Sequence, residues 1–258
     1  MRRFYFSLAL ACSLAGTLWG SDDPFCGKWK LNMEKSKLVG EQVKIQDLGG
    51  NKYQWTSSKG SYPITYDGTD QQVSLGRTIS MAPEGTNSWK MVIKRDGRVV
   101  SSMTHTLSAD GKTQTIKGTE TKPDGTTSDF TDVWKKVSGG SGWGGTWEST
   151  DFRFNSSDEY DIEPYEGDGL SFNMPAYKDV LSMKFDGKDY EEKGPNVAPG
   201  SMSSGKRLNG RTLEVTDKVK GQVVDHTTFG VSPDGKTLTL TIHETGQPKA
   251  LTIVYDKM

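Results

Sequence analysis

Short runs of alternating apolar and polar residues extend along most of the chain and are separated by clusters rich in glycine. In residues 28–32, Trp29 and Leu31 alternate with polar residues, so that both side chains fall on one face of a strand. Similar runs predict further strands in the first half of the chain at 42–46, 53–56, 62–66, 89–94, 99–107, 113–117 and 130–137. Asp-Gly pairs between several of these runs indicate hairpin turns, which need positive φ. No segment sustains a period of 3.6 residues, so the pattern predicts an all-β barrel or sandwich.

The chain contains two copies of one sequence pattern. Gly-Lys-Trp at 27–29 returns as Gly-Thr-Trp at 145–147, and Ser-Ala-Asp-Gly-Lys-Thr at 108–113 returns as Ser-Pro-Asp-Gly-Lys-Thr at 232–237. Three further blocks recur in the same order, and all offsets lie between 118 and 124 residues. Such ordered repetition indicates a tandem duplication. We therefore predict one barrel over 21–137, a flexible Gly/Ser linker over 138–144 and a second barrel over 145–258.

The first twenty residues have the pattern of a secretory signal peptide. Arg2 and Arg3 precede an apolar run over 4–15 that is too short to span a bilayer. Small residues follow and predict cleavage after Gly20, with Ala15 as the second choice, and a secreted or periplasmic protein. Removal of 1–20 leaves Cys26 as the single cysteine, so no internal disulfide is expected, and its place beside Phe25 predicts a packed apolar side chain.

Composition and motifs exclude several function classes. Lys and Arg together number 32 and Asp and Glu 33, which leaves no basic surface for nucleic acid. Only 33% of residues are hydrophobic, and no second segment approaches the length of a membrane span. The chain lacks a Gly-x-Ser-x-Gly nucleophile motif, a phosphate-binding glycine loop and the Cys/His spacing of a metal site. We therefore expect no enzymatic activity, no cofactor and no metal.

The ordered motifs resemble lipocalin-like domains that occur, often duplicated, in exported bacterial proteins of unassigned activity. The motifs are Gly-Lys-Trp-Lys-Leu-Asn at 27–32, Asp-Gly-Lys-Asp at 186–189, the two Asp-Gly-Lys-Thr turns and Val-Tyr-Asp-Lys at 254–257. The resemblance implies two tandem antiparallel up-and-down β-barrels. It also implies that Trp29 and Trp147 are structural residues on the barrel floors, each beneath the closing strand, with Lys135 or Lys136 and Lys257 near them.

A more distant similarity connects the repeats to fatty-acid-binding proteins. That family holds the ligand carboxylate with an Arg-x-Tyr pair on its last strand. In this chain the arginine position carries Ile253 in the second copy and Asp132 in the first, and Trp134 replaces the tyrosine of the first copy. Neither repeat has the carboxylate anchor, so fatty-acid binding does not follow from the similarity.

The hairpin around Asp234 and Gly235 has a register that the hydrophobic pattern specifies. A four-residue loop places three pairs on one apolar face: Val231 with Leu238, Phe229 with Leu240 and Thr227 with Ile242. The same register makes His226 and His243 cross-strand neighbours on the polar outer face. An exposed polar pair is the favoured interpretation of these two residues, and a surface metal site is the alternative.

Applied to the first copy, this register places His105 and Gln114 inside the barrel, where the second copy has Phe229 and Leu238. Buried polar groups need partners, so the two residues either bond each other or water, or they orient a ligand. We predict that the first barrel binds a small apolar or weakly polar ligand. The predicted site comprises Met103, His105, Leu107, Gln114, Ile116, Trp89 and Met91. The alternative is an envelope or surface interaction module whose barrels are filled by their own side chains.

Overall fold

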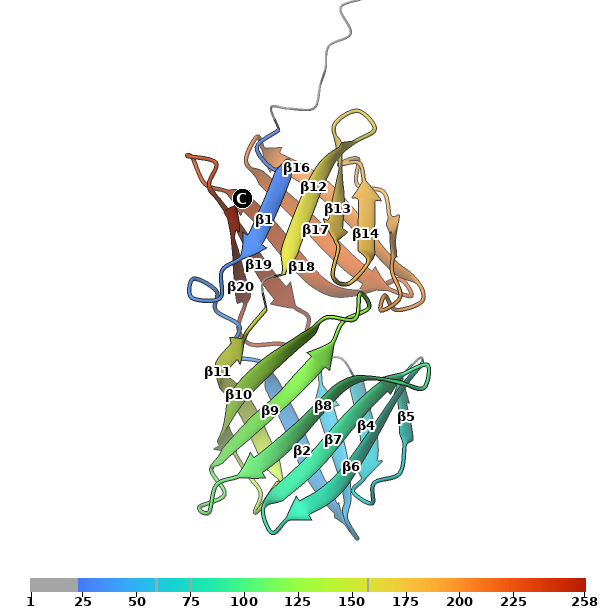
Figure 1. Ribbon diagram of the computed structural model, residues 1–258, viewed down its shortest axis with the longest axis vertical. Coiled ribbons are helices and arrows are strands. Elements are labelled where there is room, and N and C mark those ends of the chain that lie inside the picture. The colour runs from blue at the N-terminus through green and yellow to red at the C-terminus, as the bar shows by residue number, and fades with distance from the viewer. Residues whose placement is uncertain (1–22, 59, 75, 157) are drawn as a thin grey trace, which may run out of the picture.

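The computed structural model describes residues 23–58, 60–74, 76–156 and 158–258. The predicted signal peptide over 1–20 lies outside the described residues. The described chain forms twenty strands joined by turns and loops, and this part of the chain has no helix. The strands build two ten-stranded antiparallel barrels, one above the other in Figure 1. The prediction of two tandem all-β up-and-down barrels is confirmed.

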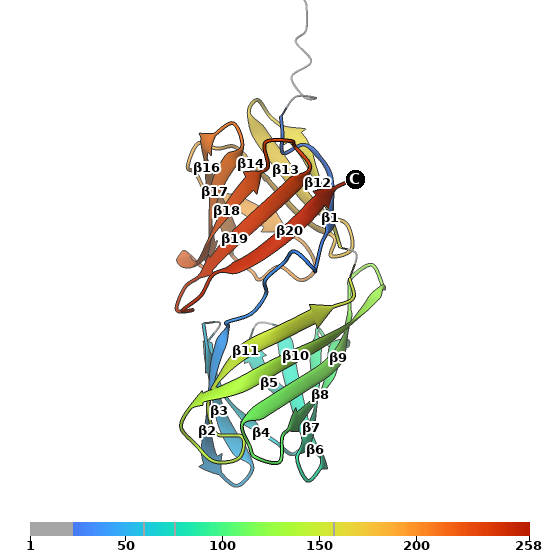
Figure 2. The ribbon, with the colours of Figure 1, turned by 90° about the vertical axis from the view of Figure 1, so that its left-hand side faces the viewer.

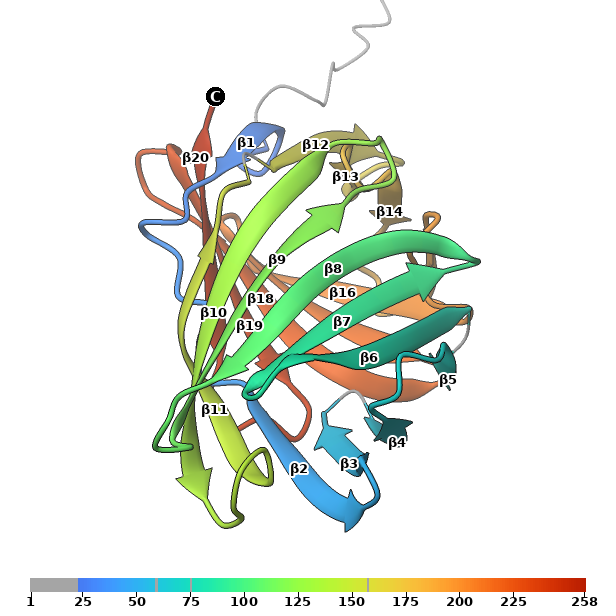
Figure 3. The same ribbon diagram turned by 60° about the horizontal axis from the view of Figure 1, so that its bottom comes forward.

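Barrel one, the lower barrel in Figure 1, has the strand order β4-β3-β2-β11-β10-β9-β8-β7-β6-β5. Its strands are β2 (Gln42–Gly49), β3 (Lys52–Ser57), β4 (Gly60–Thr65), β5 (Gln71–Ser74), β6 (Arg77–Gly85), β7 (Ser88–Arg95), β8 (Arg98–Leu107), β9 (Thr113–Thr121), β10 (Thr127–Ser138) and β11 (Gly145–Phe154). Strands β4 and β5 form the two edges (Figure 3). The side-chain amide of Gln71 joins these edges, since it accepts a hydrogen bond from the Thr65 amide (2.7 Å) and donates one to the Thr65 carbonyl (2.6 Å). The barrel is therefore nearly closed.

Barrel two is a closed barrel with the order β1-β12-β13-β14-β15-β16-β17-β18-β19-β20. Its strands are β1 (Gly27–Leu31), β12 (Glu159–Tyr165), β13 (Gly169–Met174), β14 (Asp179–Met183), β15 (Tyr190–Lys193), β16 (Ser201–Asn209), β17 (Thr212–Val219), β18 (Gln222–Val231), β19 (Thr237–Glu244) and β20 (Leu251–Lys257). Cys26 packs against the core of this barrel.

The first strand of each repeat belongs to the barrel of the other repeat. Strand β1 pairs with β12 and β20, and Figure 2 shows the blue β1 beside the red β20. Strand β11 pairs with β10 and β2. The predicted boundaries 21–137 and 145–258 are therefore wrong at their first strands, because the equivalent first strands of the two repeats fit either barrel. The predicted linker contributes Ser138 to β10 and forms the β10–β11 hairpin loop over 139–144. The barrels are joined instead through residues 32–41 and the connection from β11 to β12.

Trp29 and Trp147 form the floors of the barrels. Their side chains are 0% and 1% exposed, and each indole Nε1 donates a hydrogen bond of 2.8 or 2.9 Å to the carbonyl four residues earlier. The Lys257 ammonium lies 5.0 Å from the centre of the Trp29 ring, and that of Lys136 lies 4.8 Å from the Trp147 ring, which favours cation–π attraction. Both side chains are buried, but the exchange of strands places Trp29 in barrel two beside Lys257 and Trp147 in barrel one beside Lys136, whereas each was expected beneath the closing strand of its own repeat.

The predicted hairpin registers are confirmed. The pairs in barrel two are Val231 with Leu238, Phe229 with Leu240, Thr227 with Ile242 and His226 with His243. In barrel one, Leu107 pairs with Gln114 and His105 pairs with Ile116. Both His226 and His243 are exposed on the outer face, and His226 Nδ1 lies 3.0 Å from the Thr216 hydroxyl. No group of three potential metal ligands occurs among the residues that the structure describes.

Candidate functional site: the cavity of barrel one

A cavity of about 770 Å³ runs from the interior of barrel one to the facing end of barrel two. One end of barrel one faces an end of barrel two (Figure 1), and the residues that line the cavity come from both barrels. Backbone contacts join the turns there, including the Asp124 amide to the Ala176 carbonyl at 3.2 Å. The apolar lining comprises Ile93, Val100, Met103, Ile116, Phe130, Phe152 and Phe154 of barrel one, Leu38 of the connection over 32–41, and Leu31, Met174, Ile253 and Tyr255 of barrel two.

Strand alternation places the apolar wall. Met103, Gly118 and Phe130 lie opposite one another on β8, β9 and β10, and every second residue of these strands faces inward. The Phe130 ring stacks on the ring of Phe152 from β11, with centroids 6.4 Å apart, and Phe154 continues the row at 6.2 Å. Two of these three rings come from the second repeat, so the exchange of β11 completes the wall.

Charged residues surround the cavity near barrel two. Arg77 and Arg95 are cross-strand neighbours on β6 and β7. Arg95 donates a hydrogen bond of 3.4 Å to the Pro195 carbonyl of barrel two. Partial desolvation and the neighbouring positive charge of Arg95 lower the pKa of Arg77. Its side chain remains open to water, because the cavity around it is wide. Burial raises the pKa of Glu120, which lines the same region.

A buried polar cluster joins the two barrels beside the cavity. Lys122, in the β9–β10 turn, forms an ion pair with Asp158, and their side chains are only 4% and 8% exposed. The hydroxyl of Tyr177, in the β13–β14 turn, lies 3.2 Å from Asp158 Oδ2 and 3.4 Å from Glu120 Oε2. The Lys122 ammonium also lies 5.4 Å from the ring centres of Phe154 and Tyr177. These contacts hold barrel two over the open end of barrel one.

Asp132 is an acidic residue on the interior face of β10 and lines the cavity. Its Oδ1 accepts a hydrogen bond of 2.7 Å from the Ser149 hydroxyl of β11. Burial raises the pKa of Asp132 to about 6, and the negative charges of Glu41 and Asp151 add to the effect. No basic side chain among the described residues forms an ion pair with this carboxylate.

The predicted site residues divide between the cavity and the packed core beneath it. Met103 and Ile116 line the cavity. His105 and Gln114 are each 2% exposed, and the side-chain Nε2 of Gln114 lies 2.7 Å from the ring Nδ1 of His105, at hydrogen-bond distance. Burial lowers the pKa of His105 to about 4, and its Nε2 has no hydrogen-bond partner in the described structure. The other three predicted residues are apolar groups packed in the core: Leu107, Trp89 and Met91.

Sequence reasoning missed Asp132, Arg77 and Arg95 as parts of a site, as well as the phenylalanine row. Asp132 carried a signal, since it lies two residues before the buried Trp134 and therefore faces the interior. Phe152 and Phe154 gave none, because their place in barrel one depends on the exchange of β11.

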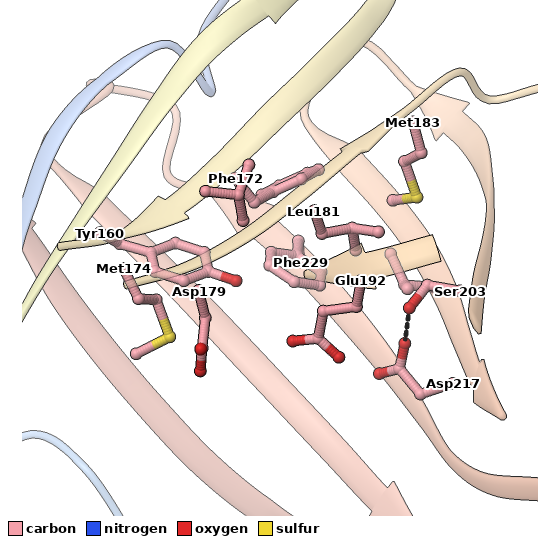
Figure 4. A pocket seen from close by; sticks show the side chains of 12 residues that line it. Tyr160, Phe172, Met174, Asp179, Leu181, Met183, Glu192, Ser203, Asp217 and Phe229 are labelled. Atoms are coloured by element: carbon pink, nitrogen blue, oxygen red, sulfur yellow. Dashed lines mark hydrogen bonds between the residues drawn. The ribbon is translucent and has the colours of Figure 1, made fainter. Parts of the chain in front are cut away.

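The interior of barrel two is largely filled. Its cavity measures only about 90 Å³ and lies between the rings of Tyr160, Phe172 and Phe229 and several carboxylates (Figure 4). Burial raises the pKa of Asp179 to about 6, and burial together with the charge of Asp217 raises that of Asp225 to about 7. A space of this size holds a few water molecules rather than an organic ligand.

The chain matches no model of a known protein family, and none of the curated proteins compared with it matches. In the described residues, no helix has the length and apolar character needed to cross a membrane.

Proposed function

We propose that this protein is an exported, non-enzymatic, lipocalin-like binding protein that holds a small apolar or weakly polar ligand in barrel one. The observation that carries the proposal is the cavity of about 770 Å³ with its apolar wall. Ligand pockets in proteins commonly enclose a few hundred to about 1,000 Å³ and combine apolar walls with a few polar groups. Met103, Ile116, Phe130 and Phe152 supply such a wall, and Asp132 supplies a polar group within it.

Barrel two acts as the cover in this proposal. Met174, Tyr177 and Tyr255 line the end of the cavity towards barrel two, whose own interior space measures only about 90 Å³. Export is supported by the signal-peptide pattern over 1–20, and the lipocalin-like assignment by the ordered motifs together with the barrel architecture.

A module with filled barrels, which recognises a macromolecular partner, is the second candidate. The packed interior of barrel two favours it for that half of the molecule. The large cavity of barrel one favours the binding protein, because a filled barrel needs no such space.

Native mass spectrometry of the full-length protein, purified from its own compartment, tests the proposal. The full chain is needed because each barrel includes one strand from the other repeat, so an isolated repeat lacks a strand of its barrel. We expect small molecules that co-purify and that organic extraction removes. A protein that carries no small molecule and that binds no aliphatic probe after extraction would contradict the proposal.

A further inference from the structure

Asp132 occupies an unusual place for a carboxylate, on the inner wall of an apolar cavity. In the β-ladders it lies opposite Ile116 on β9 and opposite Phe152 on β11, and both neighbours line the same cavity. Phe130, two residues earlier on β10, faces the cavity as well. The carboxylate is therefore surrounded by apolar and aromatic side chains, where an unpaired charge is costly.

The protein itself provides little compensation for this charge. The Ser149 hydroxyl donates a hydrogen bond to Oδ1, and the indole N–H of Trp134 also favours the charged form, but both donors are neutral and the charged groups that act on Asp132 are the acidic Glu41 and Asp151. Neutral hydrogen bonds compensate a buried carboxylate less well than a cation does. The position of Asp132 therefore favours a positive charge that the described residues do not supply.

The basic residues around the cavity have other surroundings. Lys122 is paired with Asp158, and Arg95 donates to the Pro195 carbonyl. Arg77 lies beside Arg95, and its positive charge lowers the pKa of Glu120 but does not contribute to that of Asp132. A positive charge near Asp132 must therefore come from the ligand.

Aromatic rings beside the carboxylate favour the same kind of group. Phe130 and Phe152 stack next to Asp132 on the cavity wall, and the faces of aromatic rings attract organic cations. A carboxylate combined with such rings recognises an alkylammonium group better than a small hydrated metal ion, whose hard oxygen ligands are not gathered here among the described residues.

We propose that Asp132 is the anchor for a positively charged group of the ligand, and that the ligand is an amine with an apolar body that extends along Met103, Ile116 and Phe130. This inference rests on the proposed function of the cavity. It assigns the chemical class of the ligand, an amphiphilic organic cation, and makes Asp132 the residue that selects the charge of the head group.

A set of three probes with the same ten-carbon chain tests this assignment. Decylammonium, decanol and decanoate are titrated separately, below their aggregation concentrations, into the full-length protein after organic extraction, and binding is followed by calorimetry at pH 7.5. We expect decylammonium to bind at least about tenfold more tightly than decanol, because a charge-assisted contact exceeds a neutral one, and decanoate to bind most weakly.

Two isosteric variants separate the role of Asp132 from that of acidity in general. Asp132→Asn retains an acceptor for Ser149 and should reduce decylammonium binding about tenfold or more while decanol binding stays within about twofold. Glu214→Gln, which neutralises an acid outside the cavity, should leave the preference for decylammonium in place.

The outcomes distinguish this inference from the proposed function. Binding of decanol and decanoate without preference for decylammonium, or a preference that survives Asp132→Asn, would overturn the assignment of Asp132 and leave the cavity as a ligand site. Absence of binding by all three probes would overturn both.

Discussion

The Gln114 side-chain amide donates a hydrogen bond of 2.7 Å to Nδ1 of His105 inside barrel one. This pair occupies the positions that Phe229 and Leu238 hold in barrel two. The bond makes His105 Nδ1 an acceptor, so the neutral imidazole carries its proton on Nε2. Gln114 therefore satisfies one ring nitrogen of His105, while Nε2, which carries the proton, has no hydrogen-bond partner in the described structure.

The buried imidazole should make the protein sensitive to acid. The pKa of His105 falls from 6.5 to about 4 in the folded state, so the unfolded state binds the proton more readily. Its contribution to stability is complete above pH 6.5 and is lost as the pH falls towards 4, by up to about 3 kcal/mol. The double variant His105→Phe/Gln114→Leu, which copies barrel two, should lose less stability over this range. Urea unfolding at pH 7 and pH 4.5 measures the difference, and equal losses in both proteins would contradict the assignment.

Asp132 should destabilise the unliganded protein at neutral pH. Its folded-state pKa of about 6 lies above the ordinary value of 3.8, so the charged form is disfavoured by folding and the penalty grows as the pH rises from 4 to 6. Asp132→Asn should increase the free energy of unfolding by about 1–2 kcal/mol at pH 7.5 and have little effect at pH 3.5. Thermal unfolding at both values tests this. Destabilisation of the variant at pH 7.5 would show that the carboxylate is compensated within the protein.

The ion pair between Lys122 and Asp158 should hold the two barrels together. Asp158→Asn removes the carboxylate that is paired with the buried Lys122 ammonium, at an expected cost of about 3–5 kcal/mol. Glu214→Gln is the matched control, since it breaks a far more exposed pair with Lys206 and should cost less than about 1 kcal/mol. Chemical denaturation of both variants measures the two costs. Similar values would mean that the inter-barrel pair contributes no more than a surface contact.

The strand exchange predicts which barrel loses its stability when Trp29 is truncated. Trp29→Ala removes the floor of barrel two and should cost about 3–5 kcal/mol. Hydrogen exchange should then accelerate first in β12 and β20, the partners of β1. Accelerated exchange confined to β2 and β10 would instead place Trp29 in the barrel of its own repeat.

Local features of the fold followed from the sequence, and long-range pairings did not. The register of the hairpin around Gly235 was predictable because its turn and its alternating faces lie within about twenty residues. The exchange of β1 and β11 was not, because the repeats present equivalent Gly-x-Trp strands to either barrel. Strands β5 and β6 escaped prediction, since β5 has only four residues and β6 ends in Pro83 and Gly85.

Of the residues predicted to form a ligand site, Met103 and Ile116 line the cavity. The comparison of the two repeats predicted His105 as a polar residue of the ligand site. His105 is instead buried outside the cavity lining, and Asp132 is the polar residue in the cavity wall. Interior volume depends on how all inward side chains pack together, and the pattern along single strands does not contain this information.

A fluorescence titration of the full-length protein with the apolar dye N-phenyl-1-naphthylamine, after organic extraction, tests the ligand cavity most directly. Ile116→Trp adds bulk to the cavity wall, and Leu208→Trp, on an exposed site of barrel two, is the control. A cavity in barrel one predicts dye binding that Ile116→Trp weakens about tenfold or more and that Leu208→Trp leaves unchanged. Dye binding of equal strength in all three proteins, or none in the wild type, would contradict a ligand site in barrel one.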